Sequence, residues 1–363
     1  MKILFDLTPL CKKTKTGIPV FAERLYEALK KHPDANVKKT FSFCDYLPIK
    51  PWKLYRLFEK ILYRQLYLPF KLYFGKYDAY IESDYMFMPL FKPQNTLIVT
   101  MVYDIALLLF DNLQTSSHNK KWGEKLAKSI HNSDILLTIS ESSKEDIQKY
   151  LQDIGEENKI LDFIYADIDE LAICKDKEIL TKFNIEDEYL LFLGTLEPRK
   201  NPLNLIKAFH AFKERSKKET KLVFAGKKGW LYDDVFAYIH QNNLQDEVIF
   251  TGYVSDEEKA CLLQHAKVFL FLSLYEGFGI PPLEALKFNT ATLVSDIAVF
   301  HELFENNVYY ANPLDVEHIA NMIEKTLLSP PMIDQKLFQK FSWDASADKL
   351  VKLVEKYQLI KTP

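Results

Sequence analysis

The sequence is short of several residue types and patterns, and each shortage excludes something. Only 10 of its 363 residues are glycine, and its 4 cysteines, Cys11, Cys44, Cys174 and Cys261, share no CxxC spacing. That arrangement argues against a zinc site or a disulfide framework, so we expect four reduced thiols. No window reaches the ~18 apolar residues of a membrane-spanning helix. No stretch resembling a signal peptide follows Met1, so we expect a cytoplasmic protein.

An excess of charge of one sign is also missing. The chain carries 47 basic and 50 acidic side chains, a formal net charge of -3, which gives no electrostatic case for binding nucleic acid. Hydrophobic residues make up 48% of the chain, as in a globular protein. A chain of this length exceeds a single core, so we expect two domains of about 150 to 200 residues each.

Strand and helix patterns alternate along most of the chain, which predicts parallel sheets in an α/β fold. Gly194, Gly226 and Gly252 each end a predicted strand, where they permit tight turns at the carboxyl edge of the sheet. The predicted strands are 2–6, 36–43, 77–82, 96–102, 134–140, 189–194, 221–226, 247–252, 267–272, 292–295 and 308–311. The predicted helices include 17–30, 202–216, 231–242, 256–265, 282–288 and 315–328.

The stretch between the two halves is charged and weakly periodic, which indicates a hinge within 165–188. We therefore expect an N-terminal domain over 1–175 and a second domain over 176–342. In 343–363, apolar residues fall on one helical stripe, so a terminal helix should pack on one domain or bridge to the first.

The segment GTLEPRKNPLNL (194–205) predicts an anion site. Arg199 and Lys200 lie in a short loop between a strand and a helix that begins with Asn201 as N-cap and Pro202. Free amides, the helix dipole and a guanidinium together favour a diphosphate. The alternative is two solvated surface cations ahead of a helix.

The segment SLYEGFGIPPLEAL (273–286) has the same organisation. A strand ends, Gly277 and Gly279 allow a ligand to approach the backbone, and Pro281 and Pro282 occupy the first turn of a helix. Glu276 lies on the loop and Glu284 one turn inside the helix, where both could accept bonds from hydroxyl groups. The alternative is a capped turn whose acids compensate the helix terminus.

These two segments together resemble the retaining glycosyltransferase family 4, also called glycosyl transferases group 1. The resemblance lies in the E-x7-E spacing from Glu276 to Glu284, in FLGTLEPRKN, in KTGIPVFAERLYEAL (15–29) and in TISESSKEDI (138–147). It covers nearly the whole chain and is strongest in the second half. It implies the GT-B fold, in which two Rossmann-like parallel-sheet domains face each other across a cleft.

The resemblance also implies a role for individual residues. The donor diphosphate would contact Arg199 and Lys200, the ribose Glu284, and the transferred sugar Glu276. Asp104, with Arg199, Lys200 and Glu276, would be catalytic. The remaining donor-side residues would be Gly17, Thr195, Tyr253, Val254, Gly277, Phe278, Gly279 and Ile280, with the base beside Tyr253 and Val254. The acceptor side would include Tyr103, Asp104 and Ser140.

The mechanism implied is departure of the nucleotide through an oxocarbenium-like state, with the growing charge stabilised by Arg199, Lys200 and helix N-termini. The configuration is retained, no cofactor is needed beyond the nucleotide-sugar co-substrate, and no metal is expected. Two positions depart from the family. Tyr103-Asp104 stands where His-Asp is usual, and Asp104 has the alternative role of a strand-end cap. Asn289 replaces a glycine, and we expect it to keep a left-handed turn.

The segment 48–77 is rich in basic and aromatic residues. Lys53, Arg56, Lys60 and Arg64 recur at spacings of three and four and are surrounded by aromatic side chains. Such a helix suits peripheral contact with an anionic membrane, here the inner face of the cell membrane. The alternative is an amphipathic helix packed on the first domain with a solvated basic face.

The function predicted is transfer of a hexose, preferably mannose from GDP-mannose, to a saccharide or polyprenyl-linked saccharide in surface glycan assembly. A UDP-sugar donor is the nearest alternative, and a non-catalytic nucleotide- or glycan-binding protein is another. An NAD-dependent dehydrogenase is disfavoured, because the first strand runs into DLTPLCKKTKTG without a GxGxxG. Acceptor, linkage and oligomeric state are not readable from the sequence.

Overall fold

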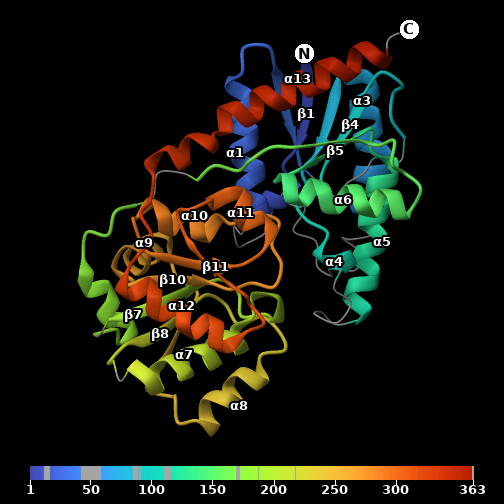
Figure 1. Cartoon of the computed structure of the whole chain (residues 1–363). Helices are drawn as coiled ribbons and strands as arrows, with labels where there is room; N and C mark the ends of the chain where they lie inside the picture. Colours follow the sequence, from blue (N-terminus) through green and yellow to red (C-terminus); the bar gives the residue numbers. More distant parts are fainter. Residues whose placement is uncertain are drawn as a thin grey trace. The chain divides into compact units, whose positions relative to one another are not determined.

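The chain folds into two compact units, each built on its own parallel sheet (Figure 1). The structure is a computed structural model that describes residues 1–11, 17–41, 59–84, 89, 91–109, 116–168, 172–186, 188–216 and 218–361. One unit comprises Met1–Asp167 with Phe341–Pro363, and the other comprises Ile168–Lys340. No helix among the described residues is long and apolar enough to cross a membrane.

The first unit contains a six-stranded sheet in the order β2-β1-β3-β4-β5-β6, with every neighbouring pair parallel. Its strands are β1 Lys2–Asp6, β2 Asn36–Thr40, β3 Ala79–Glu82, β4 Leu97–Met101, β5 Ile135–Thr138 and β6 Ile160–Phe163. Its helices are α1 Gly17–Lys31, α3 Leu68–Gly75, α4 Ala106–Leu109, α5 Ser116–Asn132, α6 Glu141–Asp153 and α13 Trp343–Lys361, with a 3-10 helix at Thr8–Cys11 and a π-helix at Glu59–Tyr67.

Strand β6 was not among the predicted strands, because its residues lie in the stretch that was described as charged and weakly periodic. It pairs with β5 at the edge of the sheet, with Ile160 opposite Ile135. All four of its residues are only half-buried. An edge strand has one paired side and needs little apolar surface, so its hydrophobic pattern is too weak to identify it.

Helix α13 packs on the first unit, where the sequence left open whether it would bridge. Its Trp343 ring lies edge-on to Phe21 of α1, with the ring centroids 5.0 Å apart. Ala347, Leu350 and Val354 follow along the same stripe and are buried. Figure 1 shows α13 running beside α1.

The second unit has the strand order β12-β11-β10-β7-β8-β9, again with every pair parallel. Its strands are β7 Tyr189–Leu193, β8 Lys221–Ala225, β9 Val248–Gly252, β10 Val268–Phe271, β11 Thr292–Ser295 and β12 Tyr309–Ala311. Its helices are α7 Pro202–Ser216, α8 Asp233–Gln241, α9 Asp256–His265, α10 Ile280–Lys287, α11 Ala298–Phe304 and α12 Val316–Leu328, with 3-10 helices at Lys177–Phe183, Pro198–Lys200 and Gln335–Lys340.

The predicted turns at the strand ends are confirmed. Gly226 has φ 147°, and a Cβ at this position would lie 2.0 Å from the Gly194 carbonyl oxygen, so the neighbouring loops can meet only at glycine. Asn289 has φ 59°, the left-handed conformation expected where relatives have glycine. These local signals were readable because each depends on the backbone of a few adjacent residues.

A row of phenylalanine rings crosses the second sheet near its carboxyl edge. Phe250 of β9, Phe224 of β8 and Phe192 of β7 are neighbours, with centroids 5.2 Å and 5.1 Å apart. The row continues from Phe192 to Phe271 of β10 at 6.3 Å and on to Phe300 of α11 at 5.9 Å. The rings therefore form a continuous apolar row across these strands.

The prediction of four reduced thiols is wrong for two of them. Cys174 and Cys261 form a disulfide, with their Cα atoms 4.6 Å apart and a separation of 87 positions in the sequence. The bond ties the segment before the Lys177–Phe183 helix to α9. Spacing in the sequence could not reveal the bond, because only the fold brings the two residues together. Cys44 lies outside the described residues.

Replacing Cys174 with serine should lower the stability of the second unit. Closing a loop of this length restricts the unfolded chain, and loss of such a bond typically costs about 2 to 4 kcal/mol. Thermal melts of Cys174→Ser and of the reduced wild type should show the same lowered Tm. Cys11→Ser is the control and should melt like the wild type. A wild type that mass spectrometry shows to hold the bond, yet melts identically after reduction, would contradict this.

The carboxyl edge of the first sheet holds a buried acid, Asp6. Its Oδ1 accepts from Thr8 N at 2.9 Å and Thr8 Oγ1 at 2.5 Å, and its Oδ2 accepts from Tyr80 Oη at 3.2 Å. Ser83 Oγ donates to the Asp6 carbonyl at 2.5 Å. Burial, opposed by the bonds from Thr8 and Tyr80, raises the pKa of Asp6 from 3.8 to about 6.

This pKa predicts that Asp6 makes stability fall as pH rises. The folded protein binds the proton more tightly than the unfolded chain, so the free energy of unfolding should drop between about pH 4 and pH 6, by up to about 3 kcal/mol. Denaturant melts of Asp6→Asn should lack this component and show higher stability than the wild type at neutral pH. Exposed Asp34→Asn is the control and should follow the wild type. Parallel pH profiles for Asp6→Asn and wild type would overturn the prediction.

Candidate functional site

The loop after β7 presents Arg199 and Lys200 in the 3-10 helix Pro198–Lys200. Pro198 begins this helix, and Asn201 ends it with φ 58° before α7 starts at Pro202. Asn201 was predicted as an N-cap, but its side-chain amide donates to the Pro313 carbonyl at 2.6 Å, which anchors the loop. The two cations are therefore held on a short, anchored turn at the carboxyl edge of the sheet.

The loop after β10 brings Glu276 to both cations. Arg199 Nη1 donates to Glu276 Oε2 at 2.8 Å, and Lys200 Nζ donates to Glu276 Oε1 at 2.5 Å. The two loops are also joined through their backbones, since Leu274 N donates to the Arg199 carbonyl at 2.8 Å. Residues predicted separately from two segments of the sequence thus form one cluster.

The cluster is largely shielded from water. The side chains of Arg199, Lys200 and Glu276 are 23%, 13% and 10% exposed. Burial opposes ionisation of Glu276, but the positive charges of Arg199 and Lys200 outweigh it and lower its pKa. At neutral pH the carboxylate is therefore charged, and it occupies the position on the two cations that an external anion would seek.

Two further side chains support the cations, and the sequence reasoning missed both. Glu197 Oε1 accepts from Arg199 Nη2 at 3.0 Å, and Arg199 Nη1 also donates to the Tyr275 carbonyl at 2.9 Å. Lys200 Nζ lies 4.6 Å from the centroid of the Phe271 ring, a cation–π distance. Glu197 was visible within LEPRKN, but its role depends on side-chain direction; the Phe271 contact depends on the fold.

Glu284 has a different cationic partner. It lies in α10, is 9% exposed, and accepts from Lys259 Nζ of α9 at 2.6 Å. Helix α9 begins with a capping box between Ser255 and Glu258, which fixes its first turn and hence the position of Lys259. The attraction of Glu284 outweighs burial and raises the pKa of Lys259. Lys259 was not among the predicted site residues.

The glycine at the start of α10 has a packing reason that the sequence did not show. A Cβ at Gly279 would lie 2.8 Å from the Phe304 ring and 3.3 Å from the Phe300 ring. Gly279 therefore fits against α11, and approach of a ligand is not needed to explain it. Pro281 and Pro282 follow Ile280 in the first turn as predicted, and Phe278 is buried.

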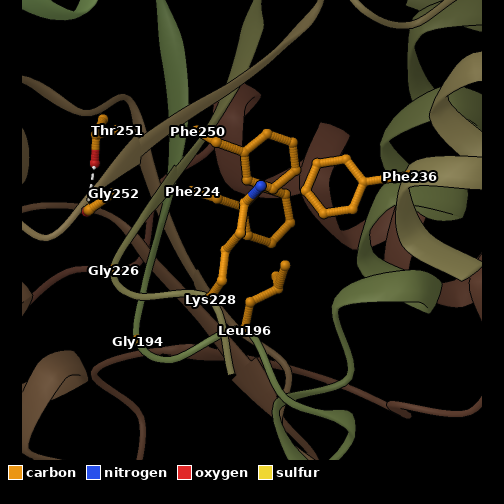
Figure 2. Close-up of a pocket in the computed structure, with 9 residues that line it drawn as sticks. All are labelled: Gly194, Leu196, Phe224, Gly226, Lys228, Phe236, Phe250, Thr251 and Gly252. Atoms are coloured by element: carbon orange, nitrogen blue, oxygen red, sulfur yellow. Dashed lines mark hydrogen bonds between the residues drawn. The ribbon is translucent and has the colours of Figure 1, made fainter. Parts of the chain in front are cut away.

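A pocket of 290 Å³ opens at the other end of the phenylalanine row (Figure 2). The rings of Phe224, Phe250 and Phe236, the last from α8, stand around Lys228, whose Nζ lies 4.7 Å from the Phe236 ring. The other lining residues are Gly194, Leu196, Gly226, Thr251 and Gly252. Flat aromatic walls with one cation suit a planar, polar-edged group.

The predicted base-side residues continue from this pocket along the chain. Tyr253 follows Gly252 directly, is 65% exposed, and has Lys227 Nζ 4.8 Å from its ring centroid. Val254 is half-buried. Thr195, in the loop that carries the cations, is also half-buried. None of the three aromatic wall residues was predicted, although Phe224 and Phe250 lie in predicted strands and Phe236 in a predicted helix.

The predicted residues of the first unit have local partners. Tyr103 Oη donates to the Ser83 carbonyl at 2.8 Å, and its ring meets Phe21 edge-on. Asp104 accepts from Ala106 N at 3.0 Å, as expected for its alternative role as a cap at the end of the strand. Ser140 is fully buried, and its Oγ caps α6 by accepting from Ser143 N.

Gly17 opens α1, and its setting differs from that of Gly279. A Cβ added at Gly17 would meet no heavy atom within 4 Å in the part of the chain that the structure describes. Packing among the described residues therefore does not explain this glycine, and its contact with the donor stays a prediction.

Metal ligands were also sought. Among the described residues, no group of three or more His, Cys, Asp or Glu side chains could hold a metal ion. The sequence contains one Asp-x-Asp, at residues 167–169, of which the last lies outside the described residues.

Comparison with known proteins identifies the family of this chain. The model of the family "Glycosyl transferases group 1" matches residues 176–357, half of the chain. The chain belongs to this family. Among its relatives is the serotype-specific mannosyltransferase WbdA of Escherichia coli, 31% identical over 236 residues, 61% of the chain and 29% of that protein. The O-antigen chain mannosyltransferase B of Escherichia coli is 26% identical over 63% of the chain and 61% of its own length. The chain thus matches less than two thirds of these relatives.

Solved structures show that this family member has the GT-B fold. Sucrose-phosphate synthase of Thermosynechococcus elongatus superposes with a TM-score of 0.71 at 16% identity, covering 98% of both chains. Anabaena HepE in complex with UDP and glucose has a TM-score of 0.67 at 16% identity, covering 98% of this chain and 99% of that one. The two parallel sheets of this chain match that architecture.

The cluster geometry predicts that Glu276 competes with an external anion. Glu276→Gln should bind pyrophosphate about fivefold more tightly, because it frees about one unit of positive charge. Lys200→Ala should weaken binding about tenfold. Isothermal titration calorimetry measures both, and Glu305→Gln, which loses an ion pair with Lys340 elsewhere in the second unit, is the control. Weaker binding by Glu276→Gln in a folded protein would show that Glu276 orients the cations and does not compete for them.

Proposed function

We propose that the chain is a retaining hexosyltransferase that moves mannose from GDP-mannose to a saccharide or lipid-linked saccharide during surface glycan assembly. The observation that carries the proposal is the cluster of Arg199, Lys200 and Glu276 at the carboxyl edge of the second sheet. The named mannosyltransferase relatives support the sugar and the setting.

The cation pair would stabilise the leaving group. As the bond between the sugar and the nucleotide breaks, negative charge grows on the diphosphate, and Arg199 and Lys200 supply fixed charge of opposite sign in a shielded site. Glu197 and the Tyr275 carbonyl keep the Arg199 guanidinium in place, so little reorganisation is needed when the charge develops. We propose that these groups provide the neutralisation without a metal.

The two acids would then bind hydroxyl groups. When a diphosphate takes over the two cations, Glu276 is released to accept from a hydroxyl of the transferred sugar. Glu284, held by Lys259 and almost buried, would accept from the ribose. In a retaining reaction the departing phosphate oxygen would take the proton of the acceptor hydroxyl, so that no protein nucleophile is required.

The pocket of Figure 2 would hold the base next to Tyr253 and Val254. Its three phenylalanine rings offer stacking surfaces, which any base can use, so they do not discriminate guanine from uracil. Anabaena HepE, which shares the fold, was solved in complex with UDP. A UDP-sugar therefore remains the alternative donor, and a binding protein without turnover remains the other.

The first unit would supply the acceptor side. Asp104 is half-buried at the end of the loop after β4, and Gly17 leaves open space at the start of α1. Tyr103 and Ser140 have hydroxyl groups engaged with Ser83 and Ser143, so they would shape the site without contacting the acceptor. For a lipid-linked acceptor, the protein would work at a membrane surface.

A donor panel tests the proposal directly. A ligand that binds the folded state raises its Tm, so GDP and GDP-mannose should raise it more than UDP, UDP-glucose or NAD. Lys200→Ala should abolish the shift, whereas Lys221→Ala, which loses a half-buried pair with Glu247 at the start of β8, should keep it. NMR of the product from GDP-α-mannose should show an α-linkage, with activity insensitive to EDTA.

Each other outcome has its own meaning. A larger rise in Tm with UDP-sugars would identify a UDP-sugar as the donor in place of GDP-mannose. A β-linked product would exclude retention of configuration. Tight donor binding without turnover on a panel of mannosylated acceptors would favour the alternative of a non-catalytic binding protein. If none of the nucleotides bound and Lys200→Ala changed nothing, the proposal would fail entirely.

A further inference from the structure

Helix α3 exposes an apolar face in the first unit. Leu66, in the preceding π-helix, and Phe70, Tyr73 and Phe74 of α3 are 46%, 52%, 63% and 73% exposed. Their spacings of four, three and one place them along one side of the helix. We refer to these four side chains as the α3 apolar face.

The opposite side of the same helix is already packed on the sheet. Leu68 and Leu72 are fully buried in a cluster that includes Leu4, Tyr80 and Ile98. A helix that packs on a sheet with one side normally presents polar residues on the other. Helix α3 instead carries large apolar side chains on its exposed side as well.

The exposed rings contact one another without removing themselves from water. The centroids of Phe70 and Phe74 are 6.1 Å apart in a stacked arrangement, and Tyr73 meets Phe74 edge-on at 5.4 Å. Three adjacent aromatic side chains with large exposed fractions form a contiguous patch, and such a patch on a protein surface usually marks a site of contact.

The charge around the patch has one sign. From residue 60 to residue 77 the sequence has no aspartate or glutamate, but it has Lys60, Arg64, Lys71 and Lys76. Lys71 Nζ lies 5.3 Å from the Tyr67 ring, so its stem runs along the aromatic surface and its charge remains at the edge. Lys53 and Arg56, which the sequence placed on the same basic stripe, lie outside the described residues.

We propose that the α3 apolar face inserts into the headgroup region of an anionic lipid bilayer. Aromatic side chains suit that depth, and the surrounding cations match the negative surface potential of such a membrane. A second copy of the chain fits less well, because a symmetric contact would bring each cation near its own equivalent. The purpose of the contact, access to a lipid-linked acceptor, rests on the proposed function, whereas the surface itself does not.

Vesicle co-sedimentation of the full chain tests this surface. Vesicles of phosphatidylcholine with phosphatidylglycerol should bind the protein, and Phe70→Ser/Tyr73→Ser/Phe74→Ser should lower the partition coefficient about tenfold or more. The control is Leu314→Ser/Leu328→Ser/Met332→Ser, which removes three side chains of the second unit that are 72%, 70% and 89% exposed. It should bind like the wild type. Both variants must retain the wild-type circular dichroism spectrum and Tm.

A charge variant separates the two parts of the proposal. Lys71→Glu should lower binding to anionic vesicles about fivefold or more, and high salt should lower wild-type binding. Equal binding to vesicles of pure phosphatidylcholine would contradict the proposed preference for an anionic membrane. No vesicle binding, or a dimer in sedimentation equilibrium that the triple α3 variant dissolves, would overturn the lipid contact. GDP-mannose binding in solution is measured on the same samples, so failure of the lipid contact and failure of the donor site can be told apart.

Discussion

The ion pairs of Glu276 with Arg199 and Lys200 are the constraint on which the second unit's carboxyl edge depends. Two cations this close, with less than a quarter of either side chain exposed, would repel each other and lose hydration if no anion stood between them. Glu276 accepts hydrogen bonds from both cations, balances part of their charge and joins the loops after β7 and β10. The site is therefore organised before any ligand arrives, and an arriving anion meets cations that already have fixed positions.

The phenylalanine row makes this arrangement effective. Its Phe271 ring contacts the Lys200 ammonium, and the cluster's side chains are at most 23% exposed, so the charges interact more strongly than on an open surface. Phe224 and Phe250, at the end of the row in β8 and β9, form walls of the pocket. One row of rings thus contacts both the cation cluster and the pocket, so a change in one ring can affect both.

Features set by neighbouring residues were predictable, and features set by distant ones were not. The alternation of strands and helices, the left-handed Asn289 and the prolines of α10 depend on short segments, and all were predicted from the sequence. The Cys174–Cys261 bond joins residues 87 positions apart, and Gly279 is explained by Phe304 of another helix. The pairing of Glu276 with the two cations depends on both kinds of feature. The two segments could be identified from the sequence, but the contact between them could not.

The carboxyl edges of the two sheets differ in how they hold their polar groups. In the second unit, charged partners such as Arg199 and Glu276 fix one another, which suits a site where charge develops. In the first unit, Asp6 is held by hydroxyl groups of Thr8 and Tyr80, and its pKa is raised to about 6, so its charge is disfavoured. The first edge therefore holds its buried acid with neutral donors, whereas the second edge holds Glu276 with two fixed cations.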